Sequence, residues 1–82
     1  AQPRRYGSVR LDIAQERAEV FVDGYYAGIV DDFDGRFQHL DLVEGPHRIE
    51  IRAEGYRPMT FNVDVMPDHT LTYRAALNPW DR

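Results

Sequence analysis

Apolar and polar residues alternate along most of the chain, which is the pattern of β-strands that bury one face. The clearest example is the segment 47–53, where Ile49, Ile51 and Ala53 alternate with charged residues. No segment shows the three-to-four residue apolar period of an amphipathic helix. The alternation predicts seven short strands, at 8–13, 18–23, 25–30, 37–43, 47–53, 59–65 and 71–75.

Turn residues separate these strands. Asp23-Gly24 predicts a two-residue hairpin, because glycine adopts positive φ without steric cost. Gly28 predicts a bulge or a place where another backbone comes close. Glu44-Gly45-Pro46 predicts a further turn. Turns at spacings of about 8 to 12 residues are typical of sandwiches, so the expected fold is all-β, an antiparallel two-sheet β-sandwich.

Length and charge limit the kind of partner. With 82 residues the chain has room for one domain. We expect residues 1–7 to be an N-terminal segment, 8–77 the sandwich domain, and 78–82 a C-terminal tail. A net charge of −4 argues against nucleic acid, whose phosphates need a basic surface. No apolar run is long enough for a membrane-spanning helix, and the absence of cysteine removes disulfides and thiol chemistry.

Several landmarks of this sequence occur in the order found in a known family. They are Val-Phe-Val-Asp-Gly at 20–24, Gly28, Leu-x-Leu at 40–42, Glu44-Gly45, His-x-Ile-x-Ile at 47–51 and Gly55-Tyr56. Over about residues 7–77 the chain resembles the PEGA domain. It departs from the Pro-Glu-Gly-Ala turn of that family, because Val43 and Pro46 flank the Glu-Gly centre.

The resemblance implies a β-sandwich module of bacterial and archaeal envelope or surface proteins without established catalytic activity. The first residues, Ala1-Gln2-Pro3, resemble what signal peptidase leaves after cleavage. We therefore expect an extracytoplasmic location in a prokaryote: periplasm, cell surface or secreted.

The acidic residues Asp31, Asp32 and Asp34 precede Gly35 and form the best candidate for metal binding. Closely spaced carboxylates in a glycine-containing loop supply the oxygen ligands that calcium prefers. The twelfth position of an EF-hand loop counted from Asp32 is Val43, which cannot ligate. The alternative is a solvated loop whose side chains cap their own backbone, and we expect no cofactor.

Aromatic residues are more numerous than one small core buries. The candidate binding residues are Phe21, Tyr25, Tyr26, Phe37 and Trp80. Phe21 falls on the outer face of its predicted strand. Exposed rings stack on sugars or bury against a neighbouring protein, whereas the alternative is that Tyr25 or Phe37 completes the core.

Catalytic residues are not apparent. The three histidines are scattered, and Ser8, the single serine, has no nucleophile motif around it. We predict a non-catalytic structural or protein-interaction module that self-associates through sheet edges, with residues 1–7 or the Trp80 tail as the added strand. The alternative is a carbohydrate- or cell-wall-binding module that uses the exposed aromatics.

Overall fold

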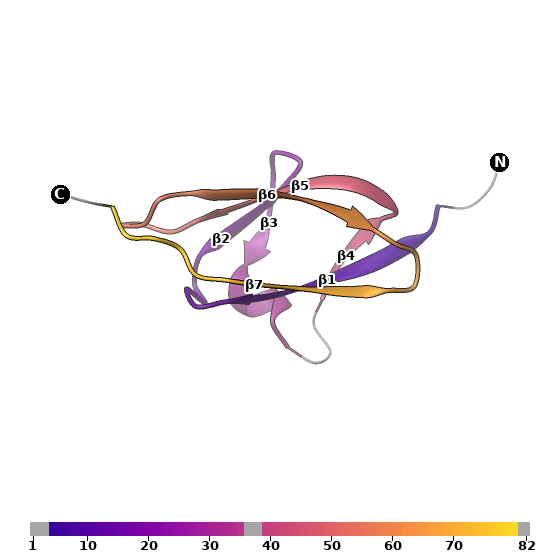
Figure 1. Cartoon of the computed structure of the whole chain (residues 1–82), viewed down its shortest axis with the longest axis horizontal. Helices are drawn as coiled ribbons and strands as arrows, with labels where there is room; N and C mark the ends of the chain where they lie inside the picture. The colour runs from indigo at the N-terminus through magenta and orange to yellow at the C-terminus, as the bar shows by residue number, and fades with distance from the viewer. Residues whose placement is uncertain (1–3, 36–38, 81–82) are drawn as a thin grey trace.

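The computed structural model describes residues 4–35 and 39–80, and it confirms an all-β sandwich of two sheets (Figure 1). The elements are β1 (Tyr6–Ile13), β2 (Glu19–Val22), β3 (Tyr25–Ile29), the 3-10 helix η1 (Val30–Phe33), β4 (Leu40–Val43), β5 (Gly45–Arg52), β6 (Met59–Val65) and β7 (Thr70–Ala75). One sheet has the order β4-β1-β7 and the other the order β3-β2-β5-β6. The sheets were expected to be antiparallel throughout, but β1 and β7 run parallel.

The core lies between the inner faces of the two sheets. β1, β2, β4, β5 and β6 contribute alternate residues to it, as the sequence pattern predicts. β7 adds only the partly buried Tyr73 and Ala75, and β3 adds no apolar side chain to the core cluster. The largest fully buried side chains are Leu11, Ile49, Ile51, Val9, Val20 and Val30. No charged or polar side chain is buried in the described part of the chain, so apolar burial is the main source of its stability.

The β2–β3 hairpin is confirmed at the predicted turn. Asp23 and Gly24 have φ values of 52° and 90°, as a type I′ turn requires. The predicted bulge is also present, because Val20 pairs with Gly28 while Phe21 pairs with Tyr26. Ala27 is therefore the extra residue of the bulged strand.

The segment 44–46 does not form a separate turn. β4 ends at Val43 and β5 begins at Gly45, so Glu44 alone carries the chain from one sheet to the other. Gly45 has a φ of 113°, which a residue with a Cβ rarely adopts. Pro46 pairs with Asp64 of β6, whereas the register with β2 begins at Ile49. The missing N–H of Pro46 therefore costs no ladder bond to β2.

The N-terminal strand begins earlier than the sequence suggests. β1 starts at Tyr6, inside the segment 1–7, and Tyr6 and Gly7 pair with Val43 and Leu42 of β4. A Cβ on Gly7 would overlap the carbonyl oxygen of Met66 and lie 2.7 Å from Cγ1 of Val65. These two residues are thus part of the sandwich.

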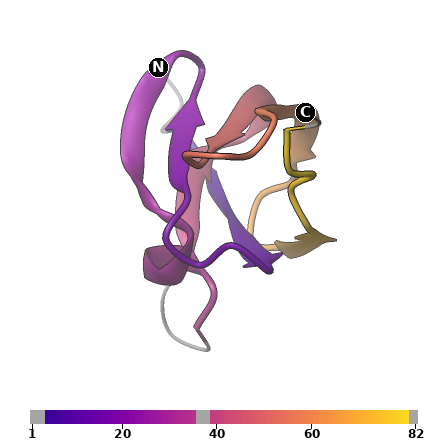
Figure 2. The same ribbon diagram turned by 90° about the vertical axis from the view of Figure 1, so that its left-hand side faces the viewer.

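The two sides of the sandwich differ. Figure 2 shows β3 and η1 on one side and β6 and β7 on the other. On the side formed by β6 and β7, the rings of Phe61 and Tyr73 stack with centroids 3.7 Å apart. Because β6 and β7 belong to different sheets and end them, this side leaves two strand edges without a neighbour.

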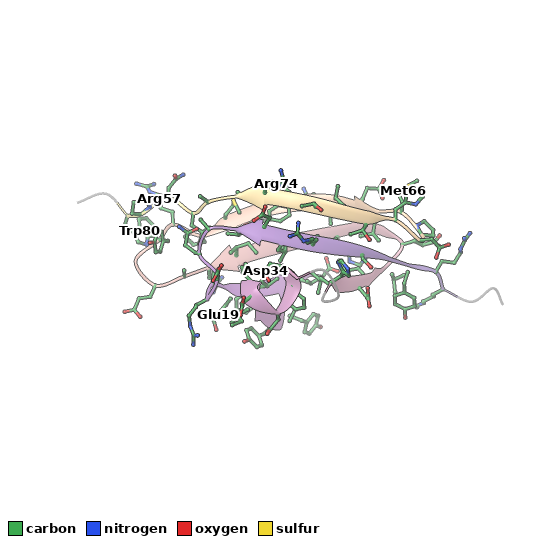
Figure 3. The ribbon with its side chains drawn as sticks, turned by 90° about the horizontal axis from the view of Figure 1, so that it is seen from below. Glu19, Asp34, Arg57, Met66, Arg74 and Trp80 are labelled. Carbon is green, nitrogen blue, oxygen red and sulfur yellow. The ribbon has the colours of Figure 1, made fainter. Side chains whose placement is uncertain are left out.

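The parallel pairing of β1 and β7 sets the positions of the chain ends. β1 starts and β7 finishes at opposite ends of the long axis, as Figure 3 shows with Met66 near one end and Trp80 at the other. The described chain therefore enters at one end of the sandwich and leaves at the other.

Candidate interaction surface at the β7 edge

The outer edge of β7 has no strand beside it. Ser8 N donates to His69 O at 2.9 Å, and Ala14 N donates to Ala75 O at 3.1 Å, at the two ends of the ladder with β1. Backbone groups alternate in direction along a strand, so the odd-numbered residues of β7 face β1. The N–H and C=O groups of Thr70, Thr72 and Arg74 therefore point away from the domain.

Two of the other sheet edges have a feature that blunts pairing. β3 contains the bulge at Ala27, and β4 is only four residues long. β6 is a longer edge that exposes one charged residue, Asp64, as β7 exposes Arg74. β7 has six residues in unbroken register with β1, with neither proline nor glycine. By the criteria that distinguish protected from unprotected edges, β7 is a long edge without a protecting feature in its middle, and it is therefore suited to accept another strand.

Apolar side chains surround the beginning of this edge. Leu71 and Met66 are 44% and 57% exposed. With Val65 they form the apolar part of an open hollow of about 240 Å³ between the end of β6 and the start of β7. An apolar patch beside an unpaired strand edge provides both area and hydrogen bonds for a contact with another chain.

Charge on the β7 edge is low. Arg74 is the one charged residue of the strand, and its Nε lies 3.1 Å from Oδ2 of Asp12 on the neighbouring strand β1. A second ion pair, Arg5 with Asp68 at 3.1 Å, lies near the opposite end of the ladder. Both pairs are exposed, so each contributes little to stability, and neither occupies the middle of the strand.

Two of the predicted aromatic residues meet on the outer face of β2 and β3. Phe21 and Tyr26 pack edge to face with centroids 5.7 Å apart, so the outward position expected for Phe21 is confirmed. The guanidinium of Arg52 lies 5.2 Å from the centre of the Phe21 ring and is held by Glu50 at 2.8 Å. This ring therefore already has a cation over one face.

The remaining predicted aromatics are not gathered at one site. Tyr25 is 79% exposed at the β2–β3 hairpin, so it does not complete the core. Trp80 lies at the far end of the domain, where the guanidinium of Arg57 is 5.0 Å from its ring centre (Figure 3). Phe37 lies outside the described residues.

The tail is attached to its own domain at residues 78–80. Arg57 N donates to Asn78 O at 2.7 Å, and Trp80 N donates to Gly55 O at 3.1 Å. Tyr56 and Pro79 form an isolated antiparallel β-bridge. Residues 78–80 and Tyr6–Gly7 are thus already paired within the domain. Among the described residues, an open strand edge of the folded domain is the other candidate for such a contact.

The acidic residues 31, 32 and 34 bond to the backbone and to arginine. Oδ2 of Asp32 accepts from Ile29 N at 3.1 Å, and the carbonyl of Asp34 accepts from Arg10 Nε at 2.9 Å. Within 4–35 and 39–80, no three acidic or histidine side chains are grouped so as to hold a metal ion. Of the three side chains, that of Asp32 caps local backbone in the way that the alternative expects, whereas Asp34 accepts through its main-chain carbonyl.

Sequence reasoning missed the pair Asp23–His47. His47 Nδ1 lies 2.6 Å from Asp23 Oδ2, and His47 Nε2 lies 2.6 Å from Val43 O. The other carboxylate oxygen of Asp23 accepts from Arg48 N at 2.9 Å. The pair joins the β2–β3 turn to the β4–β5 corner. The sequence signals for this pair are the Asp-Gly landmark at 23–24 and the His-x-Ile landmark that begins at His47, which meet in the folded chain.

The geometry of this pair favours its charged form. Burial opposes the charge on His47, but the hydrogen bonds to Asp23 and to the Val43 carbonyl outweigh burial and raise the pKa of His47 above 6.5. The hydrogen bond from Arg48 N, followed by that from His47, lowers the pKa of Asp23 below 3.8. Both ring nitrogens face acceptors, an arrangement that the doubly protonated ring satisfies with two donors.

A larger hollow than that beside β7 lies elsewhere. It has a volume of about 500 Å³ and opens at the end of the domain between the β1–β2 loop and the β5–β6 loop. Ser8 does not line this hollow but lines the smaller one between β6 and β7, and its hydroxyl donates to Asp41 at 2.7 Å. The described residues include no helix of the length and apolarity that a membrane crossing requires.

The fold defines a small all-β sandwich of two sheets, in which the β7 edge is open. The model of the PEGA domain matches residues 6–81, nearly the whole chain. The chain belongs to the PEGA domain family, whose members are small domains generally found in extracellular proteins. No curated protein and no solved structure gives a significant match.

Proposed function

We propose that this PEGA domain is a non-catalytic structural module of the prokaryotic cell envelope or surface that associates with a second copy through the β7 edge. The observation that supports the proposal is the unprotected outer edge of β7, six residues long and bordered by exposed Leu71 and Met66. The general occurrence of PEGA domains in extracellular proteins supports the location.

Pairing of two β7 strands is compatible with their sequence. In an antiparallel pair centred on Thr72, this residue lies opposite its counterpart, and Thr70 lies opposite Arg74 of the second copy. The outward groups of residues 70, 72 and 74 then exchange about six hydrogen bonds. Threonine pairs are favourable across strands, and the two Arg74 side chains stand at opposite ends of the contact.

The test is the solution mass of the chain across a concentration series, measured for the parent and three variants. Thr72→Pro removes an outward N–H while leaving the N–H groups that face β1, so it should abolish the dimer. Thr72→Val keeps that N–H and should still dimerise. Thr72→Lys places two like charges opposite each other and should weaken the dimer.

Circular dichroism checks that each variant folds. A parent that stays monomeric at all concentrations, or a folded Thr72→Pro variant that dimerises as the parent does, would contradict the proposal. Species larger than a dimer would instead indicate a head-to-tail contact between unlike edges.

Carbohydrate binding is the second candidate, favoured by the exposure of Tyr25 (79%) and Tyr26 (59%). It ranks lower because the rings do not form a flat platform: Phe21 and Tyr26 meet at 65°, and Arg52 lies over Phe21. Replacing both tyrosines with alanine should abolish retention on cell-wall material if this function holds. Equal retention of a folded double variant would eliminate it.

A further inference from the structure

The inner edge of β7 has a different arrangement from its outer edge. β1 and β7 are the first and last strands, and they pair in parallel through six consecutive positions, from Ser8 with Thr70 to Ile13 with Ala75. The chain enters at the start of β1 and leaves from the end of β7. Because the strands are parallel, those two points lie at opposite ends of the ladder (Figure 3).

We propose that the β1–β7 ladder is a mechanical clamp that resists tension applied between the two ends of the domain. Tension pulls β1 and β7 in opposite directions along their common axis. The hydrogen bonds lie across that axis, so the force acts on all of them together in shear. The domain then serves as a tension-resistant link in whatever chain or assembly holds its two ends.

The resistance follows from strand geometry. Successive residues of a strand are about 3.3 Å apart, and a hydrogen bond weakens steeply when donor and acceptor lose alignment. A slip of a few ångströms therefore misaligns the whole ladder at once, whereas peeling would break one bond at a time. The barrier to forced unfolding is set by this simultaneous step, because forced unfolding is governed by the unfolding rate.

Contacts at both ends of the ladder extend it. At the start of β1, Asp68 N donates to Tyr6 O at 3.0 Å. Beyond the end of β7, the Gln15 side chain accepts from Leu77 N at 2.7 Å and its amide lies 3.5 Å from Leu77 O. Leu77 is itself buried, at 4% exposure. Tension on the C-terminal side must therefore release Leu77 before it reaches β7.

The other side of β1 also opposes sliding. Residues Tyr6 to Val9 pair with Val43 to Leu40 of β4, and Glu44 N donates to Arg5 O at 2.8 Å. β1 is the middle strand of its sheet, so it cannot slide without breaking bonds to both neighbours.

The experiment is single-molecule pulling in two directions, which the cysteine-free sequence makes straightforward. The pair Arg4→Cys and Ala76→Cys applies force between the two ends of the ladder, in shear. The pair Arg4→Cys and Thr70→Cys applies force at one end only and peels β1 from β7. All three sites are exposed, so both double variants should melt as the parent does.

The expected result is a severalfold higher unfolding force in shear than in peeling at the same pulling speed. Equal forces in the two directions, with unchanged thermal stability, would overturn the proposal. Single molecules are pulled, so the result does not depend on whether copies associate through the outer edge of β7.

Discussion

The two sides of the sandwich close the same core in different ways. On one side, η1 follows β3 and packs against β1, and Phe33 joins the core cluster. On the other side no helix follows, and the stacked rings of Phe61 and Tyr73 fill the gap between β6 and β7. The covered side consists of β3, η1 and β4, and its two strand edges are bulged or short. The open side consists of β6 and β7, and the edge of β7 there is unbroken and accessible.

This difference indicates where each side tolerates change. The covered side depends on side chains that come close to the backbone of β3, and the open side depends on close approach between main-chain segments. A glycine marks each of these contacts: Gly28 beside η1 and Gly7 beside the β6–β7 turn. Adding one methyl group at each position measures how rigid the two sides are.

The largest effect is expected on the open side, from Gly7→Ala. The new Cβ would overlap the carbonyl of Met66, which is main chain and cannot rotate away. We expect a loss of about 3 kcal/mol or more in the free energy of unfolding, measured by urea denaturation. A loss below about 1 kcal/mol would show that the β6–β7 turn gives way easily.

A smaller effect is expected on the covered side, from Gly28→Ala. The Cβ would lie 2.8 Å from Oδ2 of Asp32 and 3.2 Å from the Phe33 ring, both of which are side-chain atoms that can shift. The φ of 152° adds strain. We expect a loss of about 1 to 2 kcal/mol in the same urea experiment. If this loss exceeded that of Gly7→Ala, the ranking of the two sides would be reversed.

The smallest effect concerns the Asp23–His47 pair, which belongs to neither side. The folded pKa of His47 is above 6.5, so its contribution to stability is complete below 6.5 and is lost as the pH rises through the folded value. The folded pKa of Asp23 is below 3.8, so its contribution is complete above 3.8 and is lost as the pH falls through the folded value.

His47→Gln should therefore lower the melting temperature most between pH 3.8 and pH 6.5. The corresponding loss in the free energy of unfolding should be about 1 kcal/mol or less, because the Asp23 side chain is 47% exposed. His69→Gln is the matched control, since that ring bonds the Pro67 carbonyl instead of a carboxylate. A difference between parent and His47→Gln that did not shrink at higher pH would contradict this account.

The sequence predicted what depends on local patterns. The alternation predicted the strands and their buried faces. Asp23-Gly24 predicted the hairpin, and Gly28 predicted the bulge. The parallel pairing of β1 and β7 was not predicted, because strand direction depends on which distant segments meet. The role of Gly7 was missed for the same reason, since Met66 is its neighbour only in the folded chain.

The candidate surface was harder to predict than the fold. Self-association through a sheet edge was expected from the fold class, but the terminal segments were assigned as the added strand. Trp80 and Tyr6 instead pair within the domain. Which edge stays open depends on strand order, and that order arises from long-range pairing that alternation does not encode.

The most direct test of the central proposal is amide hydrogen exchange in β7 at low and high protein concentration. The outward amides of Thr70, Thr72 and Arg74 should exchange quickly in the monomer and become protected as the concentration rises. The amides of Leu71, Tyr73 and Ala75, which face β1, should be protected at both concentrations. Outward amides that exchange equally fast throughout would contradict association through the β7 edge.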